Sequence, residues 1–235
     1  MKIMVINPNT SIPMTNQIRI ALEAIKRSDT ELTVTCPAKG PETIESAYDE
    51  AYAIPPTLEL VKKANQDGFD AVILACFSDP GLDAAKEVSG IPVVGIEEAT
   101  LHMAAMLGAK FSIMTPRRQR IPSKAEHVHL RGLSHFLASV RSLDLTVAET
   151  EADPTKTKQR LIEVSKIAVE QDGAEVIIMG CAGMAGYAQE IEQTLNIKVL
   201  DPSAVALKTA EAMVDLGLSH SKAGLFAKPP EKIFK

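Results

Sequence analysis

The sequence predicts an α/β protein of two pseudo-symmetric lobes, each a mainly parallel sheet flanked by helices, with an active site in the cleft between them. Two observations lead to this prediction. Apolar runs rich in β-branched residues alternate with helical patterns along the 235 residues, an order typical of βα units and parallel sheets. One strand-to-helix segment is also repeated, with Cys76 in the first copy and Cys181 in the second.

The individual elements follow from local patterns. Strands are predicted where β-branched and other apolar residues form short runs, at residues 3–7, 31–36, 71–76, 91–96, 111–115, 143–149, 175–181 and 197–201. Helices are predicted where apolar residues recur at helical spacing, at 13–27, 55–67, 81–88, 97–107, 124–137, 154–171, 186–195 and 203–217. Thr10 or Ser11 is expected to cap the first helix, and residues 222–235 to form an irregular arm.

The repeat extends beyond the cysteines and suggests an ancient duplication. Three residue pairs share one offset, namely Gly68 with Gly173, Cys76 with Cys181, and Gly81 with Gly186. The alternative is that any two βαβ units resemble each other. We expect residues 1–95 and 204–235 to form the first lobe and residues 96–203 to form the second.

Composition limits the partners. The net charge is −5 and no Lys/Arg block is present, which argues against a nucleic-acid partner because phosphates favour a basic face. The short basic run at 117–120 is interpreted as a solvated loop or helix start. No apolar stretch approaches the ~18 residues of a membrane span. Three cysteines and no signal-peptide pattern predict a cytoplasmic protein whose thiols are available for chemistry.

The two cysteines are candidates for a matched acid/base pair, which could remove a proton from one face of a carbon and return it to the other. Ser78 or Asp79 is expected to cap a helix directly after Cys76, and a helix N-terminus lowers a thiol pKa from about 8.5 toward 7. The alternative is that Cys76 is a small buried hydrophobe. Cys181 is bracketed by Gly180, Gly183 and Gly186, which allow close backbone approach to a ligand.

Other motifs narrow the chemistry. Asn7 and Asn9 follow the first strand and could bind a substrate carbonyl or amide, or could belong to a capped turn without a ligand. Residues 40–46 either border the cleft or cap the next helix. No GxGxxG, phosphate-binding loop or GxSxG motif is present, and no histidine is clearly tied to either thiol, so nucleotide cofactors and hydrolase chemistry are disfavoured. His127 and His129 would face apart on a helix, which disfavours a metal site.

These motifs together resemble the aspartate/glutamate/hydantoin racemase superfamily, and specifically its hydantoin and allantoin racemase branch. The resemblance covers nearly the whole chain and rests on NPNTS, GPETIES with YDEA, ACFSDPGLDAAKE, IPVVGIEEA, GAEVIIMGCAGMAG and the closing SKAG and KPPEK segments. It implies two lobes, a small-molecule substrate that is a 5-substituted hydantoin or allantoin, a mechanism without a cofactor or metal, and a homo-oligomer.

The resemblance also implies roles for individual residues. Cys76 and Cys181 match the two acid/base cysteines of that branch. The positions expected at or near the substrate are Asn9, Ile44, Phe77, Ser78, Asp79, Thr115, Gly183 and Met184. The chain departs from the pattern at Pro116, where a second threonine is expected, so one wall of the pocket is expected to differ. A decarboxylase that uses one cysteine and a two-lobed binding protein without catalysis are the alternative functions.

Overall fold

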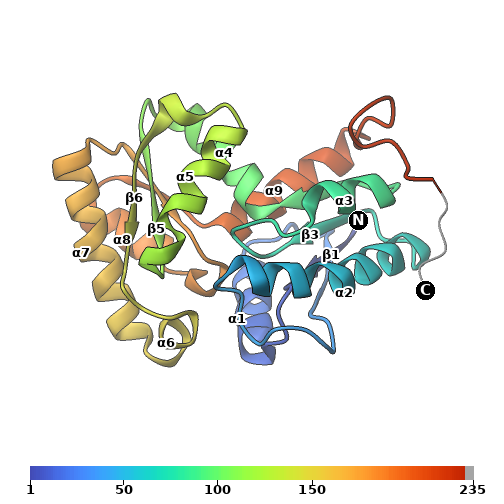
Figure 1. Cartoon of the computed structure of the whole chain (residues 1–235), viewed down its shortest axis with the longest axis horizontal. Coiled ribbons are helices and arrows are strands. Elements are labelled where there is room, and N and C mark those ends of the chain that lie inside the picture. Colours follow the sequence, from blue (N-terminus) through green and yellow to red (C-terminus); the bar gives the residue numbers. More distant parts are fainter. Residues whose placement is uncertain (231–235) are drawn as a thin grey trace.

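Two four-stranded parallel sheets flanked by helices form the computed structural model, which describes residues 1–230 (Figure 1). The first sheet has the order β2-β1-β3-β4 and comprises β1 (Lys2–Ile6), β2 (Glu31–Thr35), β3 (Ala71–Leu74) and β4 (Val93–Gly95). The second has the order β6-β5-β7-β8 and comprises β5 (Phe111–Thr115), β6 (Leu137–Ser142), β7 (Val176–Met179) and β8 (Lys198–Leu200). The predicted α/β fold class is confirmed.

The helices follow the strands in the expected alternation. They are α1 (Ile12–Glu23), α2 (Ala47–Gln66), α3 (Leu82–Val88), α4 (Ile96–Leu107), α5 (Ile121–Leu130), α6 (Val147–Ala152), α7 (Pro154–Asp172), α8 (Ala188–Leu195) and α9 (Pro202–Asp215). Ser11 caps α1, as predicted, because its hydroxyl accepts a hydrogen bond from the backbone N–H of Met14 at 3.2 Å. Within residues 1–230 no helix combines the length and apolar character needed to cross a bilayer.

The two sheets repeat one topology. β1 lies between β2 and β3, and β5 lies in the same way between β6 and β7. Gly68 and Gly173, paired in the sequence, both adopt a φ of 73°, a left-handed conformation that glycine enters without steric cost. The predicted repeat therefore extends to the backbone conformation before each cysteine strand.

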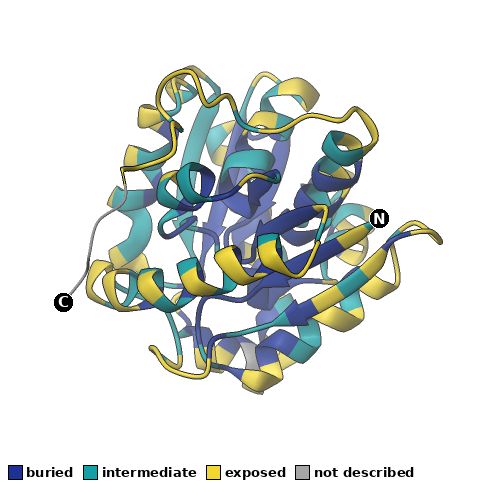
Figure 2. Cartoon of the chain, turned by 90° about the vertical axis from the view of Figure 1, so that its right-hand side faces the viewer, coloured by how far each residue is buried: buried dark blue, intermediate teal, exposed yellow. Residues whose placement is uncertain are grey.

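Alternating strand residues supply the cores on the two faces of each sheet. Ile3 and Ile73 of the first sheet join one buried cluster with Phe111 and Ile113 of the second. The opposite faces pack separately, the first sheet against α2 and α3 and the second against α7 and α8. Buried strands lie inside, and the outer faces of the helices are exposed (Figure 2). The shared cluster fixes the carboxyl edges of both sheets relative to each other.

The C-terminal helix α9 packs against α4, α1 and β3, and thus contacts elements of the first sheet. The division into 1–95 with 204–235 and 96–203 stays a prediction, and residues 231–235 lie outside the described part of the chain. After α9 the backbone forms an arm that is joined to the first sheet through His220, whose ring accepts a hydrogen bond from the backbone N–H of Val93 at 2.8 Å.

Three predicted elements differ from the structure. The strand predicted at 143–149 is wrong, because β6 lies at Leu137–Ser142 and the chain at Thr146 starts α6 with a capping box. β6 is an edge strand, half-buried along its whole length, so it lacks the apolar run expected of an inner strand. The helix predicted at 124–137 ends at Leu130. The helix predicted at 55–67 begins at Ala47, capped by Ser46, with Pro55 and Pro56 inside it.

Candidate active site

The two cysteines occupy equivalent corners of the two sheets. Cys76 lies two residues beyond the end of β3, and Cys181 lies two residues beyond the end of β7. The same backbone hydrogen bond precedes each: Ala75 donates to the carbonyl of Ile6, and Gly180 donates to that of Met114, both at 2.8 Å. In each sheet, the neighbouring central strand, β1 or β5, therefore holds the cysteine corner in the same way.

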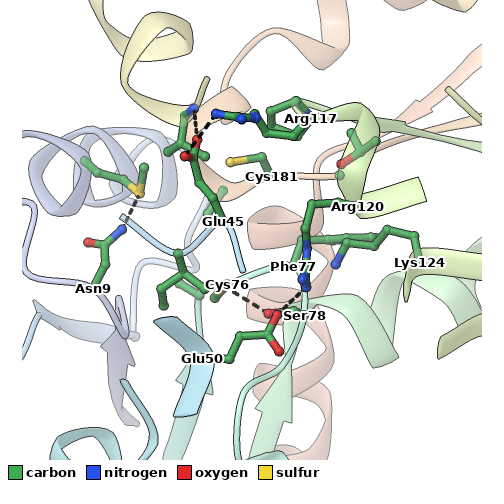
Figure 3. Close-up of a pocket in the computed structure, with 18 of the residues that line it drawn as sticks. Asn9, Glu45, Glu50, Cys76, Phe77, Ser78, Arg117, Arg120, Lys124 and Cys181 are labelled. Carbon is green, nitrogen blue, oxygen red and sulfur yellow. Dashed lines mark hydrogen bonds and ion pairs between the residues drawn. The ribbon is translucent and has the colours of Figure 1, made fainter. Parts of the chain in front are cut away.

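Both cysteines line one pocket, which is built from residues of both sheets and their following loops (Figure 3). The pocket contains about 550 Å³ of empty space, part of which is open solvent. Five of the predicted substrate-binding residues also line it, namely Asn9, Ile44, Phe77, Ser78 and Thr115. Pro116, where the chain departs from the expected pattern, forms part of the same wall.

Asp79, Gly183 and Met184 do not line this pocket as the described residues form it. Asp79 caps α4, since its carboxylate accepts from the backbone N–H groups of Glu97 and Glu98 at 3.0 and 2.7 Å. Met184 is fully buried in the core of the second sheet. Gly183 lies behind Cys181: a Cβ added there would be 3.6 Å from the Cys181 sulfur. These three residues lie behind the pocket wall.

The prediction that Ser78 or Asp79 caps the helix after Cys76 is wrong. The helix predicted at 81–88 is present as α3, but Gly81 precedes it without a side-chain cap. The carbonyl of Cys76 instead accepts from the backbone N–H groups of Ser78 and Asp79 at 2.8 and 2.9 Å. The signal was misread because Asp79 caps a helix that begins seventeen residues later in the chain, α4.

The environment of the Cys76 thiol raises its pKa, whereas a lowered pKa was expected. Burial raises the pKa to about 12, although a hydrogen bond with Ser78, whose Oγ lies 3.5 Å from the sulfur, and the charge of Lys124 oppose this rise. The charges of Cys181 and Glu50 raise it further. Cys76 is therefore a neutral thiol at neutral pH.

Asn9 has a fixed amide orientation. Its Oδ1 accepts from the Asn7 Nδ2 at 2.6 Å and from the Ser11 backbone N–H at 2.9 Å. Its Nδ2 is directed at the sulfur of Met14, 3.3 Å away, and a thioether is only a weak acceptor. The amide N–H group can therefore donate to an oxygen of a bound molecule in the pocket.

The basic run at 117–120 is only partly solvated, so its interpretation as a solvated segment is wrong for two of its arginines. Arg117 lines the pocket and pairs with Glu45 at 3.4 Å, and Arg120 lines it and pairs with Glu50. Arg118 is mostly exposed. The position of this run in the sequence would have indicated a place at the pocket. The run directly follows β5 at the carboxyl edge of the sheet, where pockets of α/β proteins form.

Charge in the site is balanced by pairs that join separate segments. Residues 44–50 lead into α2 beside the first sheet, whereas residues 117–120 follow β5 of the second sheet. The Glu45 carboxylate also accepts from the Val147 backbone N–H at 2.7 Å. Among the described residues, no group of three or more His, Cys, Asp or Glu side chains is arranged to hold a metal ion.

Two parallel α/β sheets, each ending in a cysteine that lines a shared pocket, define a class of proteins suited to acid/base chemistry at one small molecule. A family model described as Asp/Glu/Hydantoin racemase matches residues 3–210. The chain belongs to this family, and its activity class is that of a racemase, an isomerase.

Individual relatives agree with the family. The hydantoin racemase of Pseudomonas sp. (strain NS671) is 41% identical over 232 residues, which span 99% of this chain and 93% of that protein. The structure of an allantoin racemase from Klebsiella pneumoniae is similar over 100% of this chain and 96% of that one, with a TM-score of 0.97 and 37% identity. The structure of an arylmalonate decarboxylase is similar over 93% of this chain and 94% of that one, with a TM-score of 0.67 and 17% identity. This similarity shows the fold alone.

Proposed function

We propose that this protein interconverts the D- and L-enantiomers of 5-substituted hydantoins by proton transfer at C5, with Cys76 and Cys181 as the two acid/base groups. The observation that carries the proposal is the arrangement of the cysteines, which lie at equivalent strand ends of two sheets and line one pocket. Two proton-transfer groups from opposite walls can act on the two faces of one carbon.

The chemistry of a hydantoin suits this arrangement. The C5 hydrogen is α to the C4 carbonyl, so loss of the proton spreads negative charge onto oxygen. One cysteine, as thiolate, takes the proton, and the other, as thiol, protonates the opposite face of the planar enolate. The roles reverse with the handedness of the substrate. The Asn9 amide lines the pocket, where its Nδ2 has, among the described residues, only the weakly accepting Met14 sulfur as partner, so it can donate to a substrate oxygen on which charge develops.

Cys76 is a thiol at neutral pH. Its pKa is raised to about 12, mainly by burial and in part by the charge of Cys181. Cys76 is therefore suited to donate a proton, and its use as a base needs a group that stabilises its thiolate. Ile44, Phe77, Ser78 and Thr115 contact the ring or its substituent, while Asp79, Gly183 and Met184 support the pocket wall from behind.

Allantoin is the second candidate substrate, because it is a hydantoin with a ureido group at C5 and needs the same proton transfer. The likeness to the Klebsiella pneumoniae allantoin racemase supports it, and the higher identity to the Pseudomonas hydantoin racemase supports 5-substituted hydantoins more generally. Circular-dichroism racemisation assays with allantoin and with several 5-alkyl- and 5-arylhydantoins, run side by side, distinguish the two.

The central test replaces each cysteine singly. Cys76→Ser and Cys181→Ser are each expected to slow racemisation of a chiral 5-alkylhydantoin by about 10²–10⁴-fold, the usual contribution of a positioned proton-transfer group. Far-ultraviolet circular dichroism checks that the fold is retained. In D₂O each variant still exchanges the C5 proton of one enantiomer. Racemisation at the wild-type rate by either variant would contradict the two-cysteine mechanism.

Further expectations accompany this function. The mechanism uses no cofactor or metal, and it takes place in the cytoplasm in a homo-oligomer that binds neither nucleic acid nor membrane. A one-cysteine decarboxylase needs only one thiol to reprotonate its intermediate, so the presence of both cysteines in the pocket argues against it. A decarboxylase or a simple binding protein would keep its function after one of the two replacements, and a two-base racemase would not.

A further inference from the structure

Lys124 is a buried cation at the wall of the pocket that the proposed proton transfer does not yet use. It lies in the first turn of α5, its side chain is 4% exposed, and it lines the pocket. Its Nζ lies 5.0 Å from the ring centroid of Phe77, the residue that follows Cys76. Figure 3 shows the Lys124 side chain extending from α5 toward Phe77. Its position brings a positive charge to the Cys76 corner.

A buried carboxylate fixes this lysine in place. Glu97, at the start of α4, is fully buried and accepts from Lys124 at 3.0 Å with one oxygen. Its other oxygen lies 2.7 Å from the Nδ1 of His127, one turn further along α5. A buried charge is costly unless it is paired and hydrogen-bonded. The network therefore holds an ammonium group where an unpaired lysine would be strongly disfavoured.

We propose that Lys124 is a positioning residue whose charge stabilises the thiolate form of Cys76, so that Cys76 can serve as the base for one enantiomer. The inference rests on the proposed function. The need for such a group follows from the site itself, because a two-base racemase must use each cysteine as a base in turn. The Cys76 side chain is half-buried at the pocket wall, where loss of solvent disfavours its thiolate.

The other charges around Cys76 do not replace Lys124. Glu50 from α2 and Cys181 after β7 both oppose the thiolate, and Arg120 is paired with Glu50. Behind the corner, Asp79 accepts from α4 and pairs with Arg131 at 3.4 Å. The Ser78 hydroxyl lowers the pKa of Cys76 most, and Lys124 is the cation that lowers it further. A nearby opposite charge typically changes a pKa by about 1–3.

The test measures Cys76 alone. The chain has three cysteines, so Cys36→Ser with Cys181→Ser leaves Cys76 as the single thiol. In this background Lys124→Met is expected to reduce the thiolate fraction about tenfold, as for a pKa one pH unit higher. Because the nucleophilicity of a thiolate rises with its pKa, iodoacetamide alkylation between pH 7 and 10 then slows about threefold.

Lys86→Met is the matched control. Lys86 is as buried as Lys124, with a 4% exposed side chain, and pairs with Glu98 at 2.6 Å, but it does not line the pocket. Its replacement removes the ion pair of an equally buried lysine, although the Glu98 partner is 33% exposed whereas Glu97 is fully buried, and should leave the alkylation rate unchanged. The double variant Lys124→Met with Glu97→Gln removes both charges of the buried pair, so it can be tested even if Lys124→Met alone fails to fold. Its alkylation should slow about threefold, as expected for the single replacement.

Racemisation provides a second readout in the chain with its native cysteines. Racemisation by Lys124→Met should fall at every pH between 7 and 10, because the Cys76 pKa of about 12 lies above this range and the thiolate fraction is reduced by the same factor throughout. Lys86→Met should keep its racemisation rate. Unchanged alkylation in both Lys124 variants, or equal slowing by Lys86→Met, would overturn the inference. Alkylation needs no substrate, so it tests Lys124 even if the cysteine replacements disprove the racemase mechanism.

Discussion

Gly180 is the residue whose replacement most directly tests how the fold positions Cys181. A Cβ at this position would lie 2.6 Å from the carbonyl oxygen of Met114 and 3.0 Å from the Cγ2 of Ile113. These distances are too short for real contacts, so in Gly180→Ala the end of β7 has to move away from β5. The movement would break the 2.8 Å hydrogen bond from Gly180 to Met114.

The magnitude follows from two effects. Overpacking costs about 1–3 kcal/mol, and a lost backbone hydrogen bond costs about 0.5–1.5 kcal/mol. Gly180→Ala should therefore lower the free energy of unfolding by about 2–4 kcal/mol. A displacement of about 1 Å at a reacting group can lower the rate about 100-fold, so racemisation should fall even where the variant is fully folded.

The assay is urea unfolding followed by circular dichroism, together with racemisation of a 5-alkylhydantoin. Gly224→Ala serves as the control, because a Cβ there meets nothing within 4 Å and should change neither quantity. If Gly180→Ala unfolds at the same urea concentration as the wild type and racemises at the same rate, the close approach of β7 and β5 does not position Cys181, and the reasoning is refuted.

Two further predictions follow from the pKa values of buried groups. In the single-thiol chain, a rise of the Cys76 pKa from 9.0 to about 12 lowers the thiolate fraction about a thousandfold. Because a thiolate of higher pKa is also more nucleophilic, alkylation should be only about 30-fold slower than for an exposed thiol. Alkylation of Cys76 at the rate of an exposed thiol would contradict this prediction. Burial and the charge of Glu97 raise the pKa of Asp79 from 3.8 to about 7, so the native state binds the extra proton and stability falls as the pH rises through this window. Asp79→Asn should remove that slope in urea unfolding, and an unchanged slope would contradict the assignment.

The strands and helices were largely predictable because their signals are local. The inner strands β1, β3, β5 and β7 are short apolar runs buried on both faces, and each was predicted within two residues at either end. The half-buried edge strand β6 lacks that signal and was missed. For the start of α2, the cap is the correct one of the two alternatives for residues 40–46, because Ser46 caps the helix. The helical pattern was recognised only from residue 55, and Pro55 and Pro56 lie inside the helix.

From the local pattern, the candidate site was most predictable where a residue lies at a strand end. Cys76, Cys181, Asn9 and Thr115 follow or end strands and line the pocket. Asp79 seemed equivalent, but its carboxylate turns away to cap α4. A side chain at a strand end can point into the cleft or back into the protein, and the local pattern does not distinguish these directions.

The sequence by itself determined the alternation of strands and helices, the repeat, and the presence of two cysteines at matched positions, because each depends on neighbouring residues or on a fixed spacing. Only the tertiary structure decided the chemical state of those cysteines. Burial raises the Cys76 pKa, and the opposing charge comes from Lys124, which Glu97 holds in place. Electrostatic effects depend on distance in space and on loss of solvent, and the residues that supply them belong to distant parts of the chain.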